Sequence, residues 1–145
     1  MKNLIIDAAK DKIFLNIIFD NKSYTNEYSN SRENFDNLSV LIFKFLKKKG
    51  LKIDELTNIF VNQGPGKFSG IRSSITICKA ISMSNSINLY GFSSNQIKDN
   101  NYNKILDLLE KGALIKGLIK PIYLWFMETI EDKCITKGIK LTDQR

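Results

Sequence analysis

The sequence predicts an α/β fold in which helices flank a mixed sheet, and three features of the chain support this prediction. Near the N-terminus, three segments rich in strand-forming residues follow one another with short turns between them. Helix-like and strand-like segments then alternate, a pattern typical of strands joined by crossover helices. One strand-to-helix junction, residues 64–72, carries three glycines and a proline, so the backbone is expected to turn sharply there.

The first three strands are expected over residues 4–8, 13–19 and 23–29. Residues 4–8 form a short apolar run, and residues 13–19 are rich in Ile and Phe, which favour strands. Asp20-Asn21-Lys22 supplies residues that form a hairpin turn before the third strand.

The rest of the predicted order is α-β-α-β-α. A helix is expected over residues 34–49, where Ser31 or Asn34 could cap the start and Gly50 would end it. The other expected elements are a strand over 59–63, a helix over 70–84, a strand over 87–93 and a helix over 104–111.

The helix expected over residues 34–49 is apolar on more than one side. Its stripe at helical spacing consists of Phe35, Leu38, Ile42, Phe45 and Leu46. Val40, Leu41 and Phe43 fall outside that stripe, so the helix is expected to be buried on two sides. Either a later part of this chain covers the second side or another protein does. We favour a partner protein, because large exposed apolar patches usually mark binding surfaces.

The helix expected over residues 70–84 mixes isoleucines with serines and an alanine, and small residues let another helix approach closely. We therefore expect both helices to contribute to one partner interface. The residues chosen for it are Leu38, Leu41, Phe43, Ser74, Ile77 and Ile81.

The glycine-rich loop does not match the known phosphate-binding motifs. In a P-loop, a glycine would replace Val61, and a serine or threonine would replace Phe68. The dinucleotide fingerprint would need a third glycine at Ser69 and an acidic residue near residues 87–90. Exposed N–H groups at a helix start still favour anions. Ligand binding and a turn that merely allows close helix packing therefore remain equal interpretations of the local chemistry.

Composition limits the chemistry that the chain can perform. It has 145 residues, enough to bury a core in one domain, and 43% of them are hydrophobic. Without histidine it can form no His-based triad or HExxH zinc site, and Cys78 and Cys134 fit no metal-ligand spacing. The N-terminal apolar run is too short for a signal peptide and no run of about 20 apolar residues exists. We therefore expect a cytoplasmic protein with no membrane span.

The formal charge of +7 and the pI near 9.4 have two interpretations. A basic protein can bind an acidic partner or nucleic acid. However, Lys, Asn and Ile are abundant throughout the chain, as AT-rich codons would produce. We favour this compositional bias, because the sequence contains no known RNA-binding motif.

The sequence of the loop, Gly64-Pro-Gly-Lys-Phe-Ser-Gly-Ile-Arg72, resembles the signature of the bacterial TsaB (YeaZ) family. Three other segments agree with that family in order, although they are less specific. They are the opening run 3–7, Gly91-Phe92-Ser93-Ser94 and Lys120-Pro121-Ile122-Tyr123-Leu124. The resemblance spans about residues 3–125. The loop residues that carry it are Gly64, Pro65, Gly66, Phe68, Gly70, Ile71 and Arg72.

The chain also departs from the family pattern. Ala8 and Ala9 replace the usual Thr-Ser, Trp125 replaces a closing arginine, and the chain is shorter than most members. The missing length falls between Ser94 and Lys120, where strands of a second subdomain would lie. We therefore divide the chain into a TsaB-like α/β domain over 1–94, a remnant of the second half over 95–127 and a polar tail over 128–145.

The resemblance implies one half of the actin/Hsp70/sugar-kinase (ribonuclease H-like) fold, with the second subdomain largely missing. It also implies a non-catalytic scaffold in the synthesis of threonylcarbamoyladenosine (t6A) on tRNA. The implied partners are the TsaD-type transferase and the TsaE-type ATPase, with tRNA contacted through the complex. A homodimer with a second copy of the chain is a further possibility. ATP and a divalent metal would be held by the partner subunits, and no cofactor is expected on this chain alone.

Two rival functions remain open at this stage. A minimal ATPase could use the glycine loop and Asp7, although Ala8 and Ala9 cannot bind phosphate as the family's hydroxyls would. We expect Asp7 to cap a turn. A small basic RNA-binding protein is the other rival. Arg72 stands in the first turn of its helix, where a positive charge is unfavourable, so a carboxylate or carbonyl partner is expected for it.

Overall fold

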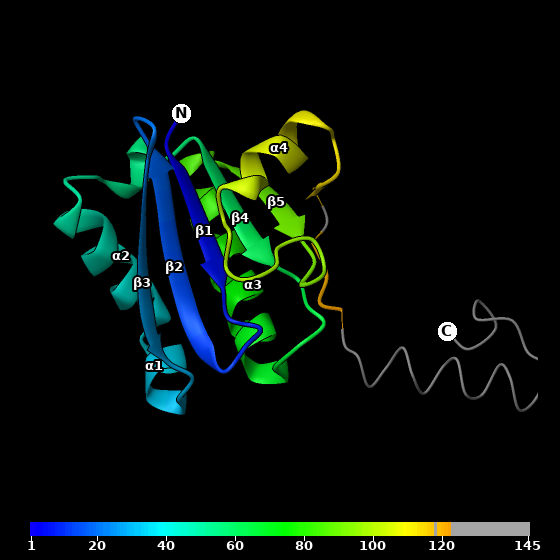
Figure 1. Cartoon of the computed structure of the whole chain (residues 1–145). Helices are drawn as coiled ribbons and strands as arrows, with labels where there is room; N and C mark the ends of the chain where they lie inside the picture. Colours follow the sequence, from blue (N-terminus) through cyan, green and yellow to red (C-terminus); the bar gives the residue numbers. More distant parts are fainter. Residues whose placement is uncertain (118, 123–145) are drawn as a thin grey trace, which may run out of the picture.

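A computed structural model describes residues 1–117 and 119–122 of the chain. Six strands and four α-helices, with one short 3-10 helix, make up this part (Figure 1). In chain order the elements are β1 (Asn3–Asp7), β2 (Lys12–Phe19), β3 (Lys22–Ser29), α1 (Arg32–Asp36), α2 (Leu38–Lys48), η1 (Ile53–Glu55), β4 (Asn58–Asn62), α3 (Phe68–Asn85), β5 (Asn88–Phe92), α4 (Lys104–Glu110) and β6 (Ile115–Lys116).

The strands form one mixed sheet in the order β3-β2-β1-β4-β5-β6. β1, β2 and β3 are antiparallel neighbours, whereas β1, β4 and β5 run parallel. Asn3 pairs with Ile18 on one side and with Asn58 on the other, so β1 joins the two halves of the sheet. The mixed sheet with flanking helices is the arrangement that the sequence predicted.

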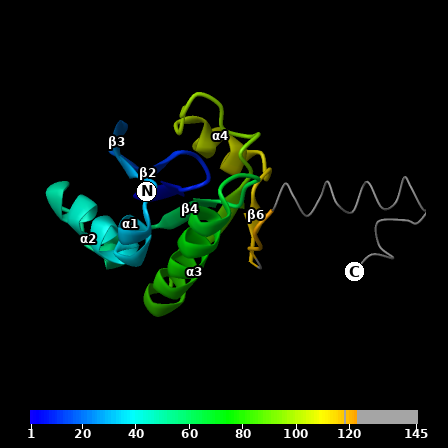
Figure 2. The same ribbon diagram turned by 90° about the horizontal axis from the view of Figure 1, so that it is seen from below.

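Helices cover the two faces of the sheet unequally. α1, α2 and α3 lie on one face and α4 lies on the other (Figure 2). Alternate strand residues point to the larger core under α2 and α3, which includes Leu4, Ile6, Leu15, Ile59 and Val61. The residues between them point to the α4 side, where the smaller core consists of Ile5, Ile18, Phe60, Phe92, Ile97, Tyr102 and Ile105.

The predicted helix over 34–49 is in fact two helices. Ser31 caps α1 by accepting a hydrogen bond from the backbone N–H of Asn34 at 3.2 Å. Asn37 then leaves the helical region, at φ −109° and ψ 18°, and separates α1 from α2. As expected, Gly50 follows the end of α2, and its φ of +71° is the left-handed conformation that glycine allows.

The other predicted elements occur within one or two residues of their expected bounds. β6 was not predicted, because two exposed residues carry no alternating pattern. The segment after β5 packs on the same sheet as the N-terminal strands. The predicted tail over 128–145 and the closing residues Tyr123, Leu124 and Trp125 lie outside the described residues.

Candidate functional site

The glycine loop joins β4 to α3 and packs against the residues that follow β1. A Cβ on Gly66 would overlap the carbonyl oxygen of Ala9 and lie 2.8 Å from the Ala9 methyl carbon. A Cβ on Gly70 would overlap the carbonyl oxygen of Ala8. The N–H of Lys67 donates to the Ala9 carbonyl at 2.8 Å. These glycines therefore allow α3 to begin directly against the end of β1, which supports the packing interpretation of the loop.

Hydrogen bonds from three other segments hold the first part of the loop. The backbone N–H of Gly64 donates to Asn62 Oδ1 at 2.7 Å, and the N–H of Ser94 donates to the Gly64 carbonyl at 2.9 Å. Ser94 Oγ donates to the Pro65 carbonyl at 2.7 Å. Just before the loop, the Gln63 carbonyl accepts a hydrogen bond from the N–H of Ile122 at 2.6 Å. The loop is thus fixed by β4, the end of β5 and the segment 119–122.

Asp7 lies at the centre of this region and has no exposed surface. Its Oδ1 accepts from Asn62 Nδ2 at 2.9 Å and from the N–H of Ala9 at 3.4 Å. Its Oδ2 accepts from the Tyr102 hydroxyl at 2.8 Å and lies 3.4 Å from Lys10 Nζ. By accepting from the Ala9 N–H, Asp7 caps the turn after β1, as we expected. Its contacts with Asn62, Tyr102 and Lys10 were not expected.

These contacts give Asp7 the environment of a structural carboxylate. Donors from the chain itself surround both oxygens, and the side chains of Ala8 and Ala9 offer no oxygen. Across residues 1–117 and 119–122, no three His, Cys, Asp or Glu side chains gather into a group that could hold a metal ion. The Asp7 carboxylate is therefore held by donors of the chain itself.

Tyr102 is one of the site residues that the sequence did not indicate. It precedes α4 and is 2% exposed, and its ring centroid lies 6.3 Å from that of Phe14. Burial raises the pKa of the Tyr102 phenol, and the charge of Asp7 raises it further, so the hydroxyl remains a proton donor. The only signal in the sequence was an aromatic residue in the Asn/Lys-rich stretch 95–103.

The structure divides the six predicted interface residues into two groups. Leu38 and Ser74 are fully buried and Ile81 is 8% exposed, so these three belong to the chain's own core, which corrects their assignment. The Ser74 hydroxyl donates to the Gly70 carbonyl within α3. Leu41 and Ile77 are partly buried against the core, and Phe43 is 47% exposed.

The exposed apolar residues gather mainly on the same two helices. Six large hydrophobic side chains are exposed among the described residues, and four of them lie on α2 and α3. These four are Val40, Phe43, Phe68 and Met83, and we call them the α2/α3 face. Val40, Phe68 and Met83 were not among the predicted interface residues. Helical spacing alone did not show which side of each helix faces the sheet, and Phe68 precedes the helix predicted over 70–84 but belongs to α3.

Arg72 lies at the start of α3, beside a hollow lined also by Phe35, Ser73 and Ile77. Its guanidinium carbon is 5.4 Å from the Phe68 ring centroid, a cation–π distance. A carboxylate or a carbonyl was expected as the partner of Arg72; the contact found among the described residues is the Phe68 ring.

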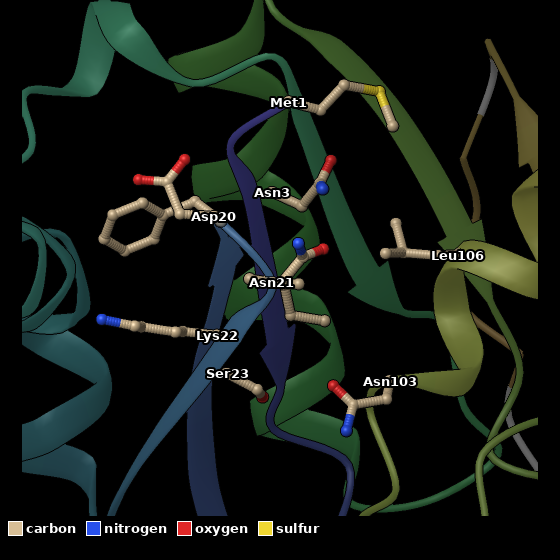
Figure 3. A pocket seen from close by; sticks show the side chains of 10 residues that line it. Met1, Asn3, Asp20, Asn21, Lys22, Ser23, Asn103 and Leu106 are labelled. Atoms are coloured by element: carbon tan, nitrogen blue, oxygen red, sulfur yellow. The ribbon is translucent and has the colours of Figure 1, made fainter.

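A separate hollow of about 590 Å³ lies at the other end of the sheet, between the β2–β3 hairpin and α4 (Figure 3). Asn3, Lys22, Ser23, Asn103 and Leu106 are among its lining residues. The Asn3 side chain takes part in an amide ladder across the sheet, in which Asn58 Nδ2 donates to Asn3 Oδ1 at 2.8 Å. The mixed polar and apolar lining indicates no particular chemistry.

No helix in residues 1–117 and 119–122 is long and apolar enough to cross a bilayer.

Comparison with known proteins gives consistent results. The family model described as "TsaD: tRNA N6-adenosine threonylcarbamoyltransferase" matches residues 13–98, more than half of the chain. The tRNA threonylcarbamoyladenosine biosynthesis protein TsaB of Buchnera aphidicola subsp. Schizaphis graminum is 29% identical over 91 residues, which cover 63% of this chain and 43% of that protein.

Two solved structures share the fold. YeaZ from Pseudomonas aeruginosa superposes with a TM-score of 0.63 at 16% identity, covering 77% of this chain and 50% of YeaZ. An uncharacterized protein with similarity to peptidase YEAZ from Pseudomonas aeruginosa gives a TM-score of 0.59 at 16% identity, covering 63% of this chain and 43% of that protein. The chain therefore spans half or less of the length of these relatives.

Proposed function

Because the chain belongs to the TsaB/YeaZ family, of which it covers only part, we propose that it is a non-catalytic subunit of the complex that makes t6A in tRNA. In this proposal it works in the cytoplasm. It binds a TsaD-type transferase through the α2/α3 face and supports the transfer of the threonylcarbamoyl group to the tRNA adenosine. The transferase holds the metal and performs the chemistry, and a TsaE-type ATPase is a further partner.

The observation that carries this proposal is the exposure of apolar side chains on α2 and α3. α2 buries Leu38, Ile42, Phe45 and Leu46 against the sheet, yet Val40 and Phe43 remain 44% and 47% exposed. On α3, Phe68 is 56% and Met83 is 83% exposed. An apolar group of this kind on two packed helices is typical of a surface that binds another protein.

The direct test is co-purification of the tagged chain with the transferase subunit of the same organism. We expect a stable complex that elutes as one species and that restores t6A when the TsaE-type ATPase and tRNA are added. A chain that elutes only as a homodimer in the presence of the transferase would contradict the proposed heteromeric role.

The ATPase alternative is tested by calorimetry on the isolated chain. We expect no ATP binding below millimolar concentration, because the Asp7 oxygens are already hydrogen-bonded and the neighbouring alanines offer no hydroxyl. Micromolar affinity would favour an ATPase over the scaffold.

A second candidate function, RNA binding, is favoured by where the positive charge lies. Residues 37–53 contain five lysines and no acidic residue, so this segment alone supplies +5 of the formal +7. The five are Lys44, Lys47, Lys48, Lys49 and Lys52. Lys44, Lys47 and Lys48 project from α2 into solvent, whereas Lys49 Nζ lies 4.1 Å from the Tyr24 ring centroid.

This charge cluster can be tested with labelled tRNA and two charge-matched variants. One variant reverses Lys44, Lys47 and Lys48 to glutamate, and the control reverses the exposed residues Lys98, Lys104 and Lys111. Three phosphate contacts would make wild-type affinity fall roughly 40-fold between 50 and 200 mM salt. If α2 binds RNA, only the first variant loses that affinity and its salt dependence. Equal loss in both variants would indicate non-specific attraction.

A further inference from the structure

We propose that Tyr102, Asp7 and Asn62 form an internal latch through which the segment before α4 sets the conformation of the glycine loop. These three residues come from segments far apart in the sequence, and consecutive hydrogen bonds connect them. The inference concerns the isolated chain and does not depend on the proposed partner.

The first step is the fixed position of the Asp7 carboxylate. It is completely buried, and a buried charge is stable only where donors surround it. The Tyr102 hydroxyl donates to Oδ2 at 2.8 Å, and Lys10 Nζ lies 3.4 Å from the same oxygen. Lys10 Nζ also donates to Asn100 Oδ1 at 2.7 Å. The segment that contains Asn100 and Tyr102 is therefore tied to Asp7 twice.

The second step is the orientation of Asn62. An ionised carboxylate can only accept hydrogen bonds, so Asp7 requires the amide nitrogen of Asn62 to face it. Asn62 Nδ2 does so at 2.9 Å, which turns Oδ1 of the same amide toward the loop. The charge on Asp7 thus selects one of the two possible amide orientations.

The third step is the effect on the loop itself. Asn62 Oδ1 accepts from the backbone N–H of Gly64 at 2.7 Å and lies 3.3 Å from Ser94 Oγ. The reversed amide would place a donor against the Gly64 donor and leave a buried N–H without a partner. The N–H of Ser94 donates to the Gly64 carbonyl at 2.9 Å, so the loop residue that Asn62 holds is also tied to the segment after β5.

The latch gives the segment between β5 and α4, which contains Tyr102, the role of holding the glycine loop. The chain spans half or less of the length of its relatives. Tyr102 and Ile105 belong to the small core on the α4 side, so this segment is held by packing as well as by the hydroxyl. Its closure over Asp7 determines how the glycine loop enters α3, the helix that carries Phe68 and Met83. Tyr102 is accordingly a positioning residue for the loop.

The test is amide hydrogen exchange on the full chain, measured by NMR at Gly64 and Ser94 and compared with Phe60 in the centre of β4. Tyr102→Phe removes only the hydroxyl. Without that donor, the Asp7 carboxylate is no longer held in place against Asn62. Loss of a buried hydrogen bond to a charged group therefore predicts at least tenfold faster exchange at Gly64 and Ser94, relative to Phe60. Tyr90→Phe is the matched control, because the Tyr90 ring stacks on Phe60 at 5.4 Å in the same core.

The proposal is overturned if the exchange ratio stays at its wild-type value in Tyr102→Phe, or if Tyr90→Phe raises it equally. If Tyr102→Phe does not fold, Asp7→Asn gives the second measurement. An asparagine at position 7 can face Asn62 with either its oxygen or its nitrogen, so the amide of Asn62 is free to reverse. The same tenfold increase at Gly64 is then expected, and an unchanged ratio would refute the latch.

Discussion

Replacing Phe43 by glutamate is the most direct test of the α2/α3 face. Phe43 is 47% exposed, whereas Leu38, Ile42, Phe45 and Leu46 on the same helix are at most 1% exposed. The structure therefore separates an outward side chain from the core stripe. A charge at position 43 should weaken partner binding while the chain stays folded.

The expected effect on folding is small. About half of the Phe43 side chain, on the order of 100 Å², is already buried, which corresponds to about 2.5 kcal/mol. Glutamate keeps two methylene groups against the same surface, each worth about 0.8 kcal/mol when buried. The free energy of unfolding should therefore fall by only about 1 kcal/mol. For a chain of this length that lowers the melting temperature by roughly 2–4 °C.

The expected effect on binding is much larger. Burying the other half of the ring in an interface contributes about 2.5 kcal/mol, and a desolvated carboxylate adds a further penalty. Since 1.4 kcal/mol is tenfold in affinity, the Kd should rise at least about 100-fold. Titration calorimetry or co-elution with the transferase subunit would measure this change.

Two control variants complete this test. Phe45→Glu, at a position with no exposed surface, should unfold the chain. Lys104→Glu, on α4 across the sheet, should leave both folding and binding unchanged. If Phe43→Glu unfolds as Phe45→Glu does, our division of α2 is wrong. If it folds and binds at wild-type affinity, α2 is not the interface.

Two further predictions concern packing and reactivity. Gly70→Val should lower the free energy of unfolding, measured in urea, by more than about 3 kcal/mol, because its Cβ would overlap the Ala8 carbonyl oxygen. Gly112→Asn is the control, since Gly112 has open space around it and a φ of +68°. Equal stability of the two variants would contradict the close packing of α3 on Ala8. Burial raises the pKa of the Cys78 thiol, so little of the reactive thiolate is present in the folded chain. In a Cys134→Ser background, Cys78 should react with a thiol reagent at least about 100-fold more slowly in the native state than in urea. Equal rates would show that Cys78 is accessible.

Much of the fold could be predicted from the sequence, because strand composition and the residues of tight turns act locally. The β2–β3 hairpin follows from Asp20 and Asn21, which adopt the positive φ values of 52° and 59° that such turns require. The need for small residues at Gly66 and Gly70 also followed from the sequence, since three glycines at a strand-to-helix junction indicate close approach of another backbone. The break at Asn37 was not predicted, since the apolar stripe continues across it.

The candidate site was predicted only in part. Helical spacing showed that the segment 38–48 was apolar on several sides, but the sheet decided which side was covered. It buried Leu38 and left Val40 and Phe43 exposed. The same limit applies to α3, where Ser74 turned inward to bond its own helix.

By itself, the sequence determined the order of the elements, the glycine loop and the family to which the chain belongs, because each depends on residues that are neighbours along the chain. Only the tertiary structure brought Tyr102 to Asp7, 95 residues away, and turned Asn62 toward Gly64. Those contacts depend on sheet register and on the path of the segment after β5. Both are set by the packing of the whole domain, so no local pattern around Tyr102 could have indicated its partner.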